Sequence, residues 1–182
     1  MRLVKGAILS ILNRSFRKDD EVVFIGFRGT NARVLLEPSH QIDDAATALE
    51  YLPTGGRTPL AHALELAKTY LTPSAFLTLV SDGPANISLR GDDPWREALT
   101  IAQEFNCRAL VIDTETPEHR IGRISELALV LRASLIPLAE IEDLEVLEIK
   151  EVFSQSVSTT QNSTALRGFQ TESHGGVARL SC

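Results

Sequence analysis

The order of apolar and polar positions predicts helices and strands that alternate along most of the chain. Apolar residues recur at helical spacing over 2–15, which predicts a helix with one buried face. Two β-rich runs flank the turn Gly29-Thr30-Asn31, so residues 22–36 are expected to form a hairpin. The run IDDAATALEYL predicts a helix, and the breaker segment Pro53-Thr54-Gly55-Gly56 ends it.

Farther along, strand candidates and helix candidates follow one another. Thr58 is expected to cap a helix that has Pro59 in its first turn. FLTLVSDG predicts a strand buried on both faces, Pro94 opens a further helix, and RALVIDTE predicts the next buried strand. A helix over 119–132, a short strand SLIPL and a last helix IEDLEVLEIKEVF complete the series. This alternation indicates an α/β fold with a parallel sheet flanked by helices.

Composition divides the chain into two parts and narrows the possible functions. Residues 1–153 form the predicted domain, whereas 154–182 are rich in Ser, Thr, Gln and Gly and are expected to be a disordered tail. A net charge of -6 argues against binding to nucleic acid or to an anionic membrane surface. No apolar stretch is long enough to span a bilayer. Cys107 and Cys182 show no disulfide framework and no metal-ligand spacing, so a reducing, cytoplasmic-type compartment is expected.

Three classes of catalytic or nucleotide site are absent from the sequence. There is no G-x-x-x-x-G-K-[ST] phosphate loop and no G-x-G-x-x-G dinucleotide motif. Ser81 does not lie in a G-x-S-x-G nucleophile elbow. The four histidines show no paired spacing; they are His40, His62, His119 and His174. A binding role is therefore favoured over catalysis by this chain alone.

Two segments carry oxygen ligands at positions where an α/β sheet binds its ligands, beyond the carboxyl ends of the strands. The Gly55–Thr58 turn presents a hydroxyl at a helix start, and Ser81-Asp82-Gly83 presents a carboxylate at a strand end. A hydroxyl and a carboxylate completed by waters form the environment that Mg²⁺ prefers. The alternative is that Thr58 is only a helix cap and Asp82-Gly83 only a turn.

Taken in order, five segments resemble one known family. KGAILSIL, EVVFIGFRG, LPTGGRTPL, LVSDGPAN and ALVIDTE are similar to the carboxy-terminal von Willebrand factor A-type (vWA) domain of the magnesium chelatase D subunit. The resemblance covers residues 3–145 and implies a Rossmann-like vWA fold. It implies Thr58 as a direct Mg²⁺ ligand and Asp82 as a ligand through water. The residues implied at the rim, where a partner would bind, are Gly55, Gly56, Arg57, Asn86 and Arg90; the last three are equally consistent with solvated loop positions.

The chain departs from the family at its first metal segment. The family's Asp-x-Ser-x-Ser motif follows a first strand that lies in the middle of the sheet, and neither precedes the helix predicted over 2–15. Thr58 and Asp82 alone are therefore expected to hold Mg²⁺ weakly. The hairpin and the FLTLV strand lose their shared neighbour, so the fold is expected to lack its first central strand. Either the two halves close against each other or a strand is supplied from upstream.

The resemblance implies a non-catalytic subunit. In the family's assembly, which inserts Mg²⁺ into protoporphyrin IX on the route to chlorophyll or bacteriochlorophyll, the vWA domain would hold the AAA+ ATPase subunit through a metal-bridged acidic contact. It would couple that ATPase to the porphyrin-binding H subunit, in the cytoplasm or in a plastid stroma. The alternatives are a vWA partner of another AAA+ system, of the cobalt chelatase or MoxR type, and a degenerate vWA remnant that binds no metal.

Overall fold

The computed structural model describes residues 5–6, 8–9, 20–50, 56–83, 85–115 and 122–141. The four described residues of the predicted first helix, Lys5, Gly6, Ile8 and Leu9, are helical. Several predictions of the sequence analysis lie outside the described residues. They concern Gly55, most of the helix over 2–15, the first residues of the helix over 119–132, the last helix beyond Ile141, and the tail 154–182.

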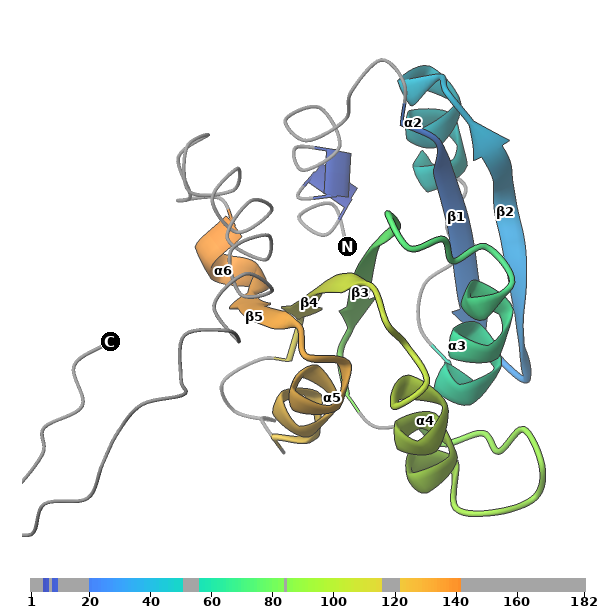
Figure 1. Ribbon diagram of the computed structural model, residues 1–182, viewed down its shortest axis with the longest axis vertical. Coiled ribbons are helices and arrows are strands. Elements are labelled where there is room, and N and C mark those ends of the chain that lie inside the picture. The colour runs from blue at the N-terminus through green and yellow to red at the C-terminus, as the bar shows by residue number, and fades with distance from the viewer. Residues whose placement is uncertain are drawn as a thin grey trace, which may run out of the picture.

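The first two strands form the predicted hairpin. β1 spans Val22–Arg28 and pairs antiparallel with β2, Asn31–Ser39, through a turn at Gly29-Thr30. Gly29 has φ +67, a left-handed conformation that glycine adopts without steric cost. The hairpin is followed by α2, Ile42–Glu50, which packs on both strands. Figure 1 shows the hairpin and α2 together on one side of the molecule.

The second sheet is parallel and carries most of the core. Its order is β3-β4-β5, with β3 at Phe76–Ser81, β4 at Arg108–Asp113 and β5 at Ser134–Pro137. The connecting helices are α4, Pro94–Ala102, and α5, Arg123–Leu131, while α6, Leu138–Ile141, follows β5. Strands joined through helices give the parallel arrangement that the alternating pattern predicted. The predicted α/β class, a parallel sheet flanked by helices, is confirmed, and this architecture is consistent with a Rossmann-like vWA fold.

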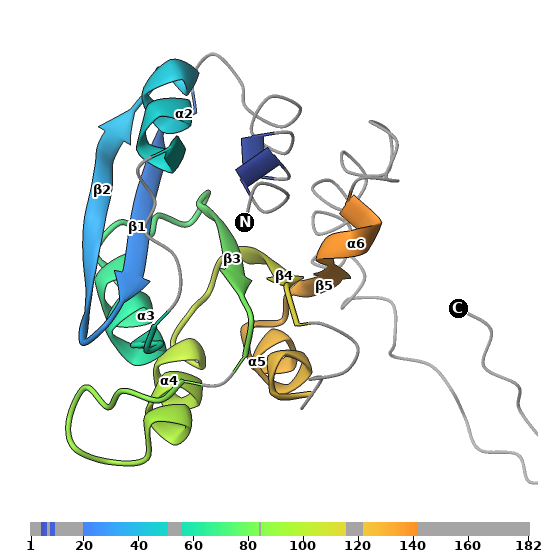
Figure 2. The same cartoon turned by 180° about the vertical axis from the view of Figure 1, so that it is seen from behind.

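A layer of three helices covers one face of the parallel sheet. α3, Leu60–Lys68, packs against α4, and α4 packs against α5 (Figure 2 shows the same layer from behind). The core beneath the layer is built around Leu64, Val111 and Leu127, which are almost fully buried. Leu110 and Ile112 of β4 point to the opposite face, as alternation along a strand requires. Burying each such side chain stabilises the fold by about 1.5–3 kcal/mol.

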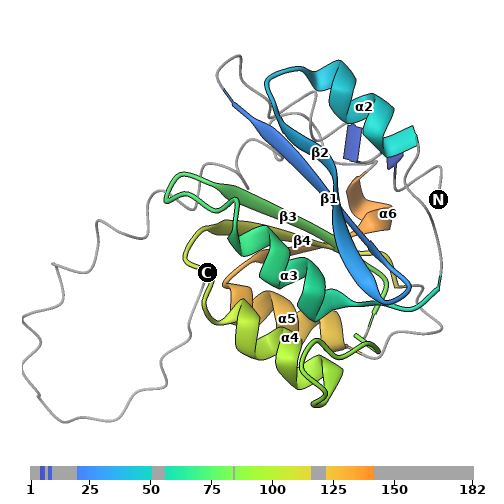
Figure 3. The same cartoon turned by 90° about the vertical axis from the view of Figure 1, so that its right-hand side faces the viewer.

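The two sheets are not joined by any backbone ladder in the part of the chain that the structure describes. β1 and β2 form one sheet and β3, β4 and β5 form the other. α3 nevertheless packs on the hairpin and also contributes Leu60 and Leu64 to the core of the parallel sheet. One helix therefore spans both sheets, as the side view in Figure 3 shows. Within the described ranges no strand joins the hairpin to β3, as expected for a fold that lacks its first central strand, and the two halves do not close against each other by strand pairing.

This split changes the environment of β3. The sequence predicted a strand buried on both faces, but Thr78 is exposed and only Leu79 and Ser81 are fully buried. Side chains of β3 do pack on both faces of the sheet, Leu79 in the core beneath the helices and Val80 against the cluster on the opposite face. Their burial is incomplete because, within the described ranges, β3 pairs with β4 alone. An edge strand keeps fewer of its side chains from solvent.

The start of α3 also differs from the prediction. Pro59, not Thr58, occupies the cap position, with φ -80 and ψ 62, and no side chain caps the helix. The ψ of Pro59 lies outside the helical range, so the helix begins only at Leu60. α4 starts as predicted with Pro94 in its first turn. The Asp93 side chain accepts a hydrogen bond from the Arg96 N–H at 2.7 Å.

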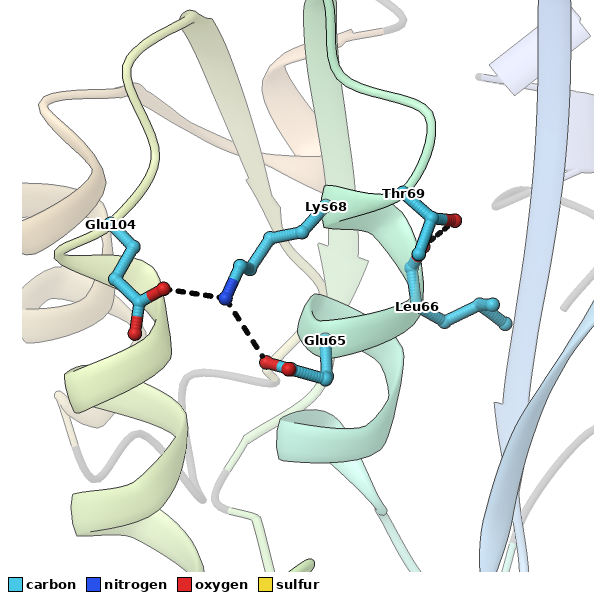
Figure 4. A network of polar contacts seen from close by, with 5 residues as sticks. All are labelled: Glu65, Leu66, Lys68, Thr69 and Glu104. Atoms are coloured by element: carbon cyan, nitrogen blue, oxygen red, sulfur yellow. Dashed lines mark hydrogen bonds and ion pairs between the residues drawn. The ribbon is translucent and has the colours of Figure 1, made fainter.

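Polar contacts connect neighbouring helices at their surface. Lys68 Nζ of α3 donates to Glu65 at 3.3 Å and to Glu104, just beyond α4, at 2.5 Å (Figure 4). The hydrogen bond to Glu104 is the main reason that the pKa of Lys68 is raised. Trp95 of α4 donates from Nε1 to Glu126 of α5 at 2.8 Å. None of the helices in the described ranges is long and apolar enough to cross a membrane.

Candidate metal and partner-binding site

The two predicted metal ligands lie on segments that the fold brings together. Thr58 precedes α3, and Asp82 directly follows β3. The N–H of Thr58 donates to Oδ1 of Asn86 at 2.7 Å, and the N–H of Asn86 donates to the carbonyl of Thr58 at 3.1 Å. This reciprocal pair joins the segment before α3 to the loop after β3. Asn86, predicted only as a rim residue, is therefore a brace between the two segments.

Thr58 keeps its hydroxyl available. Its backbone N–H and carbonyl are both used by Asn86, and the hydroxyl does not cap α3. The side chain is partly exposed, and among the described residues its hydroxyl makes no hydrogen bond. The alternative that Thr58 is only a helix cap is therefore wrong for this structure.

Asp82 is followed by Gly83, whose backbone lies close to a second acidic residue, Glu115. The side chain of Asp82 is exposed, and the buried Gly83 that follows has φ +143. A β-carbon at Gly83 would lie 3.2 Å from Oε1 of Glu115, so the Glu115 carboxylate approaches this backbone closely. The parallel register explains the proximity, because Ser81 at the end of β3 is paired with Asp113 at the end of β4. The Glu115 N–H donates to Oδ1 of Asp113 at 2.8 Å, which helps to fix this strand end.

The sequence analysis did not select Glu115 as a site residue. The signal was present, because RALVIDTE ends in acidic residues at the carboxyl end of a buried strand. What was missing was the register that places the end of β4 beside the end of β3. Strand-end acidic residues on adjacent parallel strands would have been the sequence feature to follow.

The ligand set has the right chemistry for Mg²⁺ but few members. A threonine hydroxyl and aspartate or glutamate carboxylates are hard oxygen ligands of the kind this ion prefers. Within the described ranges, however, no group of three His, Cys, Asp or Glu side chains is placed to hold a metal. The residues present therefore fit a weakly held Mg²⁺ whose remaining positions are filled by water or by a partner's oxygen.

A buried carboxylate holds the loop that leads from this site to α4. Glu97 is only 7% exposed. It accepts hydrogen bonds from the N–H groups of Leu89 at 2.5 Å, Arg90 at 2.8 Å and Asp92 at 3.2 Å, and from the Ser88 hydroxyl at 3.0 Å. Burial alone would raise the pKa of Glu97, but these bonds to its ionised form outweigh it and the pKa is lowered. His62 of α3 adds a bond from Nε2 to the carbonyl of Ser88 at 3.1 Å.

The remaining predicted rim residues lie in two different parts of the structure, beside the hairpin turn and on the loop that Glu97 holds. Gly56 and Arg57 are exposed beside the hairpin turn, where the Gly29 N–H donates to the carbonyl of Arg57 at 3.1 Å. Gly56 has φ +104, a conformation that favours glycine. Arg90 is exposed on the loop held by Glu97. The pKa of Glu104 is lowered mainly by its hydrogen bond from Lys68, and the charge of Arg90 adds a smaller effect. In the described part of the chain Arg90 forms no hydrogen bond or ion pair with Thr58 or Asp82.

Comparisons with known proteins give several relatives. A magnesium chelatase 67 kDa subunit of Chlorobaculum parvum is 34% identical over 167 residues, which cover 79% of this chain and 27% of that subunit. The corresponding 67 kDa subunit of Chlorobaculum tepidum is 44% identical over 97 residues, covering 49% of this chain and 16% of that subunit. An uncharacterized protein of Methanocaldococcus jannaschii is 29% identical over 142 residues, covering 70% of this chain and 80% of that protein. No family model matches the chain.

The chain thus spans about a quarter or less of the chelatase subunits it matches, 27% and 16% of their lengths. The two chelatase subunits are the kind of protein that the five ordered motifs indicated. Together with the α/β architecture, they confirm the predicted resemblance: this chain is similar to the D-type subunits of magnesium chelatase.

Proposed function

We propose that this chain is a non-catalytic vWA module of a magnesium chelatase D-like subunit, which holds an AAA+ ATPase subunit through a Mg²⁺-dependent contact. The observation that carries the proposal is the similarity to chelatase subunits over most of the chain. In the proposed complex the ATPase drives Mg²⁺ insertion into protoporphyrin IX on the porphyrin-binding H subunit, in the cytoplasm or a plastid stroma. This chain supplies the docking surface between them.

The site supports such a role through its own residues. Thr58 would hold the ion directly with a hydroxyl that no neighbouring group in the described structure uses. Asp82, exposed at the end of β3, would hold it through water, with the Glu115 carboxylate next to the adjoining Gly83. A bound Mg²⁺ supplies an open coordination position for a carboxylate oxygen. Asn86 keeps the two segments together, and Glu97 keeps the following loop in place.

The proposal is tested by capture of the ATPase subunit on the immobilised chain, with Mg²⁺ or with EDTA. Thr58→Ala and Asp82→Ala should each weaken capture in Mg²⁺ by about tenfold or more, because each removes a ligand from a sparse set. Neither change should alter the circular dichroism spectrum, since both side chains lie at the surface. In EDTA the wild type and the two variants should behave alike.

Matched controls separate this effect from a general loss of polar surface. Thr72→Ala and Asp43→Asn remove a hydroxyl and a carboxylate from exposed positions away from the site, and should capture the ATPase like the wild type. Capture that is unchanged in both Thr58→Ala and Asp82→Ala, or that is indifferent to Mg²⁺, would sink the proposal. The second result would favour the alternative of a vWA remnant that binds no metal.

One observation favours the alternative of a vWA partner for a different AAA+ system. The relative from Methanocaldococcus jannaschii carries no chelatase name and matches this chain over 80% of its own length. Capture experiments with an ATPase subunit of a cobalt chelatase or of the MoxR type, run beside the magnesium chelatase ATPase, decide between the pathways. The site residues and the role of Mg²⁺ are the same in either case.

A further inference from the structure

Two exposed arginines meet where the hairpin turn contacts the segment before α3. The Gly29 N–H donates to the Arg57 carbonyl at 3.1 Å, which fixes the turn against residues 56–57. The Arg28 side chain then passes over Gly56, where a β-carbon would lie 3.8 Å from its Nε. Arg28 and Arg57 therefore lie on adjacent backbone segments, and Arg57 directly precedes Thr58 in the sequence.

Neither arginine has an acidic partner within the described ranges of the chain. Among the described residues, the ion pairs are formed by His40 and Lys68, and Arg28 and Arg57 take part in none. Both side chains are exposed on a chain whose net charge is -6. Two neighbouring positive charges without a counter-charge attract an anion from outside, especially at low ionic strength.

The chemistry of the guanidinium group narrows the class of anion. Its planar fork donates two parallel hydrogen bonds to a carboxylate or a phosphate. The net charge of -6 opposes binding of nucleic acid, whose charge is dense and extended, more strongly than binding of a short peptide segment at a locally positive site. A carboxylate is also the group that the neighbouring Thr58 and Asp82 site would receive.

We propose that Arg28 and Arg57 form a receptor for side-chain carboxylates of an acidic segment on the partner, beside the metal-dependent contact and independent of the metal. The proposal rests on the proposed function only for the identity of that partner. Arg57 was predicted as a rim residue from the sequence. Arg28 is included in the receptor because the hairpin turn contacts residues 56–57.

The test measures binding of a fluorescein-labelled octaglutamate peptide to the full chain. Binding is measured by fluorescence anisotropy at low salt, with Mg²⁺ or with EDTA. Arg28→Gln and Arg57→Gln should each weaken binding by about threefold in both conditions, and the double variant by about tenfold. Arg33→Gln is the matched control, because Arg33 is an exposed arginine of the same hairpin that lies on β2. It should bind the peptide like the wild type.

Four outcomes would overturn the inference. The first two are no measurable binding of octaglutamate to the wild type, and a double variant that binds the peptide as tightly as the wild type does. The third is an Arg33→Gln variant that loses as much affinity as Arg28→Gln or Arg57→Gln. The fourth is displacement of the peptide by stoichiometric tripolyphosphate, which would indicate a phosphate site. Failure of the proposed function is recognised separately. It appears in the capture experiment, as binding of the ATPase subunit that neither Mg²⁺ nor Thr58→Ala changes. Failure of this inference alone appears in the peptide experiment, as octaglutamate binding that the arginine substitutions leave unchanged.

Discussion

At the scale of single residues, Glu97 links the core to the candidate site. Its carboxylate is buried among the core residues of α4, yet its four hydrogen-bond donors all come from the loop 88–92. That loop follows Asn86, which braces Thr58. A buried carboxylate is tolerated only when such donors replace its water. Removing its charge should therefore loosen the loop as well as destabilise the fold.

We expect Glu97→Gln to lower the free energy of unfolding by about 2 kcal/mol, because an amide cannot accept from all four donors. The pKa of Glu97 is lowered from its ordinary value of 4.5, so its stabilising effect is present above that value. The effect is lost as the pH falls through the lowered folded value. Chemical denaturation between pH 3 and pH 7 should accordingly show a smaller acid-induced loss in the variant than in the wild type. Glu140→Gln, at an exposed position of α6, is the control and should match the wild type.

At the scale of elements, the apolar pattern was sufficient to place the strands and helices, because the helices bury one face and β4 is a continuous apolar run buried on both faces. The starts of helices were less predictable. Thr58 looked like a cap, but the conformation of Pro59 moves the start of α3 to Leu60. The acidic residues at the end of RALVIDTE marked the strand end that carries Glu115, but selecting Glu115 needed the strand register, and selecting Arg28 needed the place where the hairpin turn docks. Such tertiary contacts leave no periodic signal.

The end of α5 gives a prediction at the same scale. Arg132 terminates the helix in a left-handed conformation with φ 53, which is uncommon for a residue with a side chain. Arg132→Gly should raise the free energy of unfolding by up to about 1 kcal/mol, because glycine adopts this conformation without strain. Ser125→Gly, at an exposed position inside the same helix, should instead lower it by about 0.5 kcal/mol. Thermal unfolding of both variants measures these changes, and a lower stability of Arg132→Gly than of the wild type would contradict the prediction.

At the scale of the whole molecule, two sheets share one helix layer without sharing a ladder. α3 packs on the hairpin and buries Leu60 and Leu64 against the core of the parallel sheet, so side-chain packing is what connects the halves. β1 pairs only with β2, and β3 only with β4, within the described ranges. Each of these two strands therefore has one edge whose backbone groups face away from its partner strand. The candidate site lies where the two halves meet, at the turn of the hairpin and the end of β3.

Amide hydrogen exchange measured by NMR tests this arrangement directly. Amides of β4, which pairs on both sides, should exchange most slowly of all the strands. In β1 and β3 the amides directed away from β2 and β4 should exchange at least about tenfold faster than those directed towards them. Because successive residues alternate in direction, fast and slow amides should alternate along each strand. Uniform protection of β1 and β3 at the level of β4 would contradict the split sheet. It would mean that a further strand, from outside the described residues or from another chain, pairs with both edges.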